Sequence, residues 1–158
     1  MSNKISAKTE YACVAIMELA VNQASSEPVR IRQIADRHSV PPRFLVQILL
    51  QLKSAGIVES TRGASGGYRL KRRPDEITLG EIMNVIEPMP INKRANPSTS
   101  SARSPATALN EVWDTAEVRR QEYLNNVTFA DLIKMANLSP VKPTHIKSTA
   151  EEFAHASH

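Results

Sequence analysis

PPRFLVQILLQLKSAGIVESTRGASGGYRLKRR, residues 41–73, is the stretch from which the expected fold follows. Its first half predicts a helix with two different faces, because at about 100° per residue the apolar and polar side chains separate. The apolar side carries Leu45, Ile48, Leu49 and Leu52, and the opposite side carries Arg43, Gln47 and Ser54. One face is therefore expected to pack in a core, and the other is left for a partner.

A β-hairpin is predicted to follow this helix. Gly56 suits the left-handed residue that ends a helix, and Ile57-Val58 begins a run of strand-forming residues. Residues 62–67, RGASGG, are typical of a turn, and residues 68–71 return with period-2 alternation. The segment thus predicts a helix followed by a glycine-tipped hairpin.

The same segment is strongly basic. From residue 43 to residue 73, seven basic residues and one acid, Glu59, give a local charge of +6, although the whole chain carries +4. The remaining residues therefore sum to about −2. A basic hairpin beside a polar-faced helix suits the phosphate backbone of nucleic acid, and such a helix can enter a major groove. An ordinary solvated turn is the alternative, since charge clustering is not specific.

Composition limits the class of protein. A chain of 158 residues with 41% hydrophobic residues can form one domain with an appendage, and with 4% aromatics the core is expected to be aliphatic. Neither a signal-peptide pattern nor an apolar run long enough to span a bilayer is found, so we expect a cytoplasmic protein with no membrane partner. No paired carboxylates, nucleophile–base pair or phosphate-binding loop predicts an enzyme.

The chain has a single cysteine, Cys13, which excludes an internal disulfide and a cysteine-only metal or iron–sulfur site within one protomer. A buried, inert thiol is expected, with no cofactor and no metal. An alternative is a redox or metal site that Cys13 makes with Glu10 or with a cysteine of another chain. For His38 we find no histidine, cysteine or acid placed to join it, so we interpret it as lying at the edge of the core.

Flanking segments complete a helix-turn-helix. Ser6 predicts the start of an apolar helix that reaches about residue 22, and residues 29–31 predict a short strand. Apolar positions recur at helical spacing over residues 31–38, and residues 39–42 predict the turn into the helix quoted above. Two short helices joined by a tight turn, the second with a polar outward face, are typical of DNA-binding proteins.

The second half of the chain predicts three more helices. Residues 78–81, TLGE, form a capping box, Ser104-Pro105 opens a long helix to about Asn125, and Thr128 caps a last short one. The long helix carries an apolar stripe that we expect to bury against a second copy of the chain. This predicted dimerisation surface consists of Leu109, Val112, Trp113, Ala116, Arg120, Tyr123 and Leu124.

The expected fold is mainly α with a small β-hairpin wing, a winged helix-turn-helix followed by a long dimerisation helix. Its divisions are a DNA-binding domain at residues 1–87, a flexible loop at 88–105, the dimerisation helix and a short packing helix at 106–138, and a disordered tail at 139–158.

A series of short motifs occurs in a fixed order along the chain. They are Tyr11-Ala12, Ile34-Ala35, Phe44-Leu45, Leu52, Ala55-Gly56, RGASGGYRL at 62–70 and ITLGEI at 77–82. Over nearly all of residues 4–138, the chain resembles the Rrf-two family of bacterial winged-helix regulators. The resemblance implies a homodimeric transcription regulator that binds double-stranded DNA, with its third helix in the major groove, its wing over the minor groove and its long helix crossing that of its partner.

The DNA-binding positions predicted in this way lie on the helix-turn-helix and on the wing. They are Arg30, Arg32, Pro42, Arg43, Val46, Gln47, Arg62, Ser65, Gly66, Gly67 and Tyr68. At the wing we expect the glycines to permit close approach to phosphate, and an arginine suits a narrow minor groove.

Two departures from the family pattern are informative. Cluster-binding members hold three cysteines in the loop after the capping-box helix, whereas residues 89–105 hold none, so a cluster of that kind cannot form here. Where some members carry a base-reading glutamate, this chain has Val46, which can touch a thymine methyl but cannot accept a hydrogen bond from cytosine. The operator of those members is therefore not transferred to this chain.

The leading hypothesis is a dimeric, cluster-free DNA-binding regulator, a repressor of a near-palindromic operator, whose effector is a small molecule, a protein or absent. The alternative is a winged-helix protein-interaction module that binds a partner protein through the exposed Val46 and Leu50.

Overall fold

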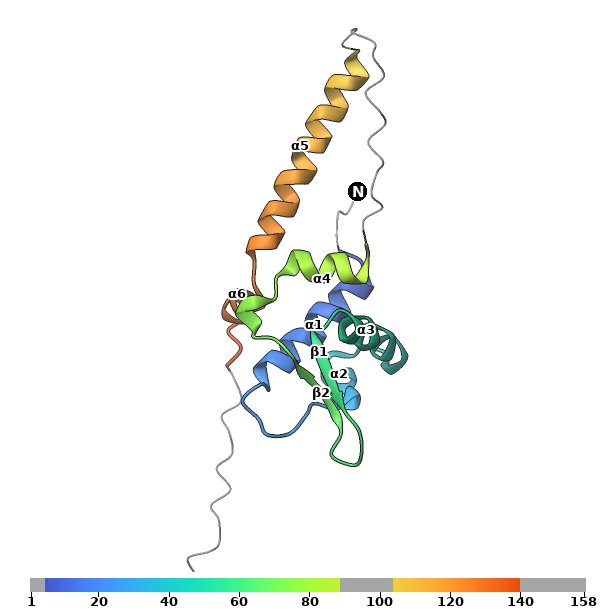
Figure 1. Cartoon of the computed structure of the whole chain (residues 1–158), viewed down its shortest axis with the longest axis vertical. Coiled ribbons are helices and arrows are strands. Elements are labelled where there is room, and N and C mark those ends of the chain that lie inside the picture. The colour runs from blue at the N-terminus through green and yellow to red at the C-terminus, as the bar shows by residue number, and fades with distance from the viewer. Residues whose placement is uncertain (1–4, 89–103, 140–158) are drawn as a thin grey trace, which may run out of the picture.

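A computed structural model describes residues 5–88 and 104–139, so most of the predicted loop and nearly all of the predicted tail lie outside the described residues. In chain order the elements are α1 (Ala7–Val21), α2 (Ile31–His38), α3 (Pro42–Ser54), β1 (Val58–Thr61), β2 (Gly67–Leu70), the 3-10 turn η1 (Pro74–Glu76), α4 (Leu79–Ile86), α5 (Pro105–Asn126) and α6 (Phe129–Met135). Strands β1 and β2 form one antiparallel hairpin. The predicted fold class, mainly helical with a small wing, is confirmed (Figure 1).

Helix α1 lies at the centre of the domain, in contact with α2, α3, α4, α6 and β2. The predicted inner face of α3 is confirmed. The side chains of this face, Leu45, Ile48, Leu49 and Leu52, have no exposed surface. Phe129 is the one aromatic side chain among the largest fully buried residues, so the core is aliphatic as expected. An amphipathic α3 thus packs its apolar face on a nearly all-apolar α1 and presents its other face outward.

The predicted helix ends are largely confirmed. The Ser6 hydroxyl accepts a hydrogen bond from the Thr9 amide, and Gly56 has φ +74°, the left-handed conformation expected there. The Thr78 hydroxyl accepts from the Glu81 amide at 3.2 Å, but the Glu81 carboxylate does not return to the cap. It binds Arg72 Nη1 at 2.5 Å instead. The capping box is half formed because a charge-assisted bond to a guanidinium is stronger than one to a backbone amide.

The predicted strand at residues 29–31 is wrong. Only Val29 pairs, as an isolated bridge in which its amide donates to Tyr68 O at 2.9 Å and its carbonyl accepts from Tyr68 N at 2.8 Å. Ile31 already belongs to α2, whose buried side chains Ile34 and Ala35 follow at helical spacing. The single bridge nevertheless ties the hairpin to the segment that leads into α2.

The interpretation of His38 also requires correction, because an acid does join it. Glu18 of α1 is buried, and its carboxylate contacts His38 Nε2 at 3.0 Å and Arg37 Nη1 at 2.5 Å. Asn22 Nδ2 donates to the same carboxylate at 3.0 Å. A buried carboxylate is stable only when its oxygens are satisfied, so this cluster fixes the end of α2 on α1.

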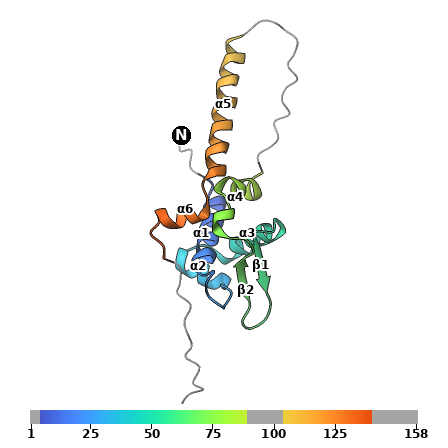
Figure 2. The ribbon, with the colours of Figure 1, turned by 60° about the vertical axis from the view of Figure 1, so that its left-hand side comes forward.

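Helix α5 stands away from the domain in both ribbon views, and none of its residues is buried (Figures 1 and 2). Its end is nevertheless held firmly, since Leu79 N donates to Val127 O at 2.8 Å and Phe129 N donates to Ile77 O at 3.0 Å. Phe129 itself is fully buried in the same core as α1. The predicted loop at residues 88–105 therefore does not separate two cores, because α6, which follows it in the chain, contributes Phe129 to the first one.

Candidate nucleic-acid interface

The outward face of α3 carries four of the predicted DNA-binding residues. Pro42, Arg43, Val46 and Gln47 are all exposed. The Arg43 guanidinium carbon lies 5.5 Å from the centre of the Phe44 ring, a cation–π distance. Phe44 in turn lies 6.4 Å from the Tyr11 ring of α1. Phe44 was not among the predicted site residues, and its role in orienting Arg43 depends on this contact with α1, which the sequence does not show.

The hairpin presents Arg62 and Ser65 as exposed residues at its tip. Gly63 adopts φ +104°, which the turn requires of glycine. Gly67 has a different role from the one expected, because a Cβ added there would lie 2.6 Å from the carbonyl oxygen of Val29. The close approach that this glycine permits is thus to the backbone of the protein itself. Gly66 is likewise crowded by the backbone of the turn.

Tyr68 lies within strand β2, opposite Ser60, rather than in the turn at the tip of the hairpin. Its side chain is half-buried and packs against the core, and both of its backbone groups bond to Val29. The predicted DNA-binding role of Tyr68 is therefore accompanied by a structural one. The same holds for Arg30, whose guanidinium Nη2 donates to Ala64 O at 2.7 Å and so ties the tip of the hairpin to the start of α2.

The predicted residues come together on one part of the molecule. Lys53 at the end of α3 donates to Ser60 Oγ of β1 at 2.7 Å, so α3 and the hairpin are neighbours. Figure 2 shows the hairpin projecting beside α3, below the level of α4. Arg32 is exposed on α2, in the same segment as Arg30. Exposed basic side chains of α2, α3 and the hairpin thus lie near the outward face of α3.

Not all basic residues in the segment are available to a nucleic acid. Arg72 binds Glu81 and Arg73 binds Asp75, both at 2.5 Å. By contrast, Arg43 and Arg62 form no ion pair within the described residues. The local charge of +6 counted from the sequence therefore overstates what this surface offers, because two of the arginines are paired. Within the described residues no ion pair is formed by Arg43, Lys53, Arg62, Arg69 or Lys71.

The predicted dimerisation stripe of α5 divides into two parts. Leu109, Val112, Trp113, Ala116 and Tyr123 are exposed, and Trp113 shows 66% of its surface. Arg120 and Leu124 are half-buried at the end of the helix that packs on α4.

Arg120 has a second contact within its own helix, where its guanidinium binds the Glu117 carboxylate through two hydrogen bonds. This pairing lowers the pKa of Glu117 below its usual range, so the pair stays charged. Among the described residues, the stripe is left without a partner in the first half of α5 and at Tyr123 in its last turn.

Cys13 is buried in α1, and burial raises the pKa of its thiol to about 12, with a smaller contribution from the charge of Glu10. Among residues 5–88 and 104–139, no three His, Cys, Asp or Glu side chains are grouped as a metal site would need. An iron–sulfur cluster of the cysteine-ligated kind needs several thiolates, and one chain supplies a single thiol. The residues present do not fit such a cluster.

At about pH 8, we expect Cys13 of the folded protein to react with a disulfide reagent at least roughly 100-fold more slowly than Cys13 of the protein unfolded in urea. The reason is that the thiol is buried and little of it is present as the reactive thiolate. The measurement is the rate of thionitrobenzoate release from the folded and the unfolded chain. A Cys13→Ser variant supplies the zero-thiol control. Fast reaction of the folded protein would restore the redox alternative.

The fold and this surface define a class of protein, the winged helix-turn-helix regulators that insert a helix into the major groove. Within that class the chain belongs to the Rrf2 family, the same family named above as Rrf-two. The family model, described as "Iron-dependent Transcriptional regulator", matches residues 5–135.

Relatives and solved structures agree with this assignment. The HTH-type transcriptional regulator IscR of Cereibacter sphaeroides is 32% identical over 83% of this chain and 87% of its own length. Protein rrf2 of Nitratidesulfovibrio vulgaris is 28% identical over 98% and 99%. The structure of T. potens IscR superimposes with a TM-score of 0.69 at 32% identity, covering 86% of this chain and 90% of that one. The structure of CymR, titled the global cysteine regulator of B. subtilis, gives 0.69 and 32%, covering 84% and 97%.

The chain is therefore a helix-turn-helix transcriptional regulator. Of the helices in the described residues, none combines the length and the apolar character that crossing a membrane requires.

Proposed function

We propose that this regulator is a cytoplasmic homodimeric repressor that binds a near-palindromic DNA operator without an iron–sulfur cluster. The observation that supports the proposal most is the distribution of free charge. Arg43 and Arg62 are exposed and unpaired within the described residues, whereas Arg72 and Arg73 at the base of the hairpin are neutralised by acids. Unpaired cations on the helix face and at the wing tip are available to the phosphates of a duplex.

On DNA, α3 would lie in the major groove with its first turns against the bases. Gln47 can bind adenine through two hydrogen bonds, and Arg43 can bind guanine in the same way or a phosphate. Val46, 41% exposed on the same side, offers only an apolar surface, which fits a thymine methyl. Arg62 at the wing tip would reach the neighbouring minor groove, where negative potential attracts arginine.

Dimerisation would bring two such surfaces onto one operator. Helix α5 exposes four large apolar side chains of the stripe, each more than half exposed: Leu109, Val112 and Trp113 in its first half and Tyr123 in its last turn. A helix of 22 residues is about 33 Å long, which gives it room to cross a second copy. The cysteine count supports the proposal of a cluster-free regulator, because the sequence holds only Cys13.

The direct test is fluorescence-anisotropy binding to the DNA upstream of the coding sequence, against a scrambled duplex, at about 50 to 200 mM salt. We expect sequence-selective binding by the untreated protein. Arg62→Ala is expected to weaken binding about tenfold and to reduce the salt slope by about 0.9 for each phosphate that the variant no longer neutralises. Arg43→Ala should weaken binding by about 1–3 kcal/mol and relax the sequence preference if this side chain reads a base.

Lys134→Ala is the matched control, because Lys134 is an exposed cation on α6, outside the proposed interface. It should leave both the affinity and the sequence preference unchanged. Affinity that neither arginine variant lowers would remove the assigned face. The competing protein-interaction module would instead show partner binding that survives high salt and is abolished by Leu50→Asp, since Leu50 is 52% exposed on α3.

A further inference from the structure

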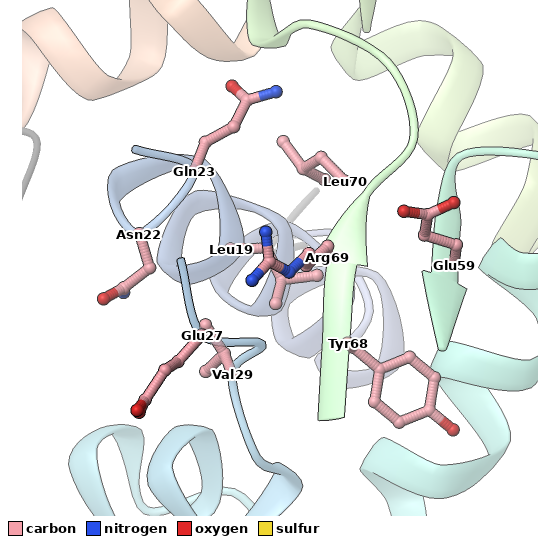
Figure 3. A pocket seen from close by; sticks show the side chains of 9 residues that line it. All are labelled: Leu19, Asn22, Gln23, Glu27, Val29, Glu59, Tyr68, Arg69 and Leu70. Atoms are coloured by element: carbon pink, nitrogen blue, oxygen red, sulfur yellow. The ribbon is translucent and has the colours of Figure 1, made fainter. Parts of the chain in front are cut away.

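A small cavity lies between the hairpin and the body of the domain. It has a volume of about 150 Å³ and is bounded by the end of α1, the loop before α2 and both strands of the hairpin (Figure 3). The buried side chains of Leu19, Val29 and Leu70 provide its apolar walls. A protein cavity of about 150 Å³ accommodates benzene, so this one has room for a ligand of about six to eight non-hydrogen atoms.

Three charged side chains also line the cavity. Figure 3 shows Arg69 extending from β2 past Leu19, with Glu27 on the loop and Glu59 on β1 to either side, while the Tyr68 ring points away. Arg69 and Glu59 are direct partners in the β-ladder. Even so, within residues 5–88 and 104–139 none of the three charged groups forms an ion pair.

We propose that this cavity binds a small free α-amino acid. The ligand carboxylate would pair with the Arg69 guanidinium, its ammonium group would pair with the carboxylate of Glu59, the ladder partner of Arg69, and its side chain would lie against the apolar walls. A guanidinium beside a carboxylate favours a ligand with charges of both signs, because a simple anion would meet Glu59 and a simple cation would meet the arginine. The volume restricts the side chain to the size of that of alanine, serine or valine.

The position of the cavity makes the bound amino acid an effector, an inference that rests on the proposed DNA-binding function. Its walls belong to α1 on one side and to both wing strands on the other, so a ligand would bridge the wing to the domain. The backbone link between the wing and the segment before α2 is the bridge between Val29 and Tyr68, which lies beside the cavity. A ligand that reinforces this link favours the wing position described above, and it would therefore strengthen DNA binding.

The binding test is isothermal titration calorimetry of the full chain, without DNA, with L-alanine, L-serine and L-valine. Isovalerate and isobutylamine each lack one charged group of valine and should bind at least tenfold more weakly, while L-tryptophan should not bind because it is too large. Arg69→Gln should lower the affinity for valine at least tenfold, and Lys134→Gln should leave it unchanged. If none of the three amino acids binds at about 10 mM, or if isovalerate binds as well as valine, the site is wrong.

The regulatory test adds the amino acid that binds to the anisotropy titration with DNA. We expect operator affinity to rise about fivefold or more, a typical coupling between two sites. If the amino acid binds but operator affinity is unchanged or falls, the coupling is overturned and the binding site stands. If the amino acid binds and no duplex is preferred with or without it, the proposed function fails while the site stands.

Discussion

Val112→Asp is expected to convert the proposed dimer into monomers and to lower operator affinity about 100-fold or more. Val112 is 64% exposed on the upper part of α5, in the stripe that contains Trp113. The substitution should leave the folded monomer intact because the side chain touches little within its own chain. In a dimer, however, the carboxylate would be buried without a partner, which costs several kcal/mol. A monomer then loses the gain of about 10²–10⁴ that two linked half-sites provide.

Val118→Asp provides a closely matched control. Val118 lies on the same helix and is 57% exposed, but at about 100° per residue it lies opposite the centre of the stripe. We expect this variant to remain dimeric and to bind DNA normally. Sedimentation velocity gives the oligomeric state of both variants, and anisotropy gives their affinities. If both aspartates act alike, or if neither changes the mass, the stripe is not the dimer interface.

Gly67→Ala is expected to destabilise the protein by about 1–3 kcal/mol, because the added methyl group would collide with the backbone of the preceding segment. The nearest atom is the Val29 carbonyl oxygen, 2.6 Å from the position of the new Cβ, and the next is its carbonyl carbon at 2.8 Å. Backbone atoms cannot avoid the clash by a change of rotamer, as a long side chain can. The bridge between Val29 and Tyr68 must therefore open. Urea unfolding followed by circular dichroism measures the decrease in stability.

The same substitution should also lower operator affinity, because the wing would lose the backbone bridge that helps to fix its position on the domain. Gly56→Asn is a useful comparison, since Gly56 needs its left-handed conformation but has nothing within 4 Å of its Cβ position. Asparagine tolerates that conformation, so we expect a smaller change in stability and no change in operator affinity. Equal effects of the two variants would contradict the steric explanation for Gly67.

Much of the fold was predictable because it rests on contacts between residues close together in the chain. Ser6, Thr78 and Thr128 were all predicted as helix caps, and each hydroxyl accepts from the amide three residues later. The two faces of α3 follow from helical spacing alone. The second half of the capping box at Thr78 was not predictable in this way, because the Glu81 carboxylate binds Arg72, which lies outside the helix.

The candidate interface was predictable in its residues but not in its arrangement. Arg43, Gln47 and Arg62 follow from the polar face, the local charge and the resemblance to known regulators. That Arg30 holds the wing tip could not be foreseen, since its partner Ala64 is 34 residues away. Nor could the neutralisation of Arg72 and Arg73, because a count of charges does not show which of them are paired.

The sequence by itself determined the positions of the helices, the hairpin turn and the apolar stripe of α5. It also determined that the chain has only one thiol. These properties depend on local geometry or on composition, which every stretch of chain carries with it. Only the tertiary structure decided that Glu18 joins His38, that Phe129 completes the core, and that Glu27, Glu59 and Arg69 surround one cavity. Their partners lie in other elements of the chain, and folding alone brings them into contact.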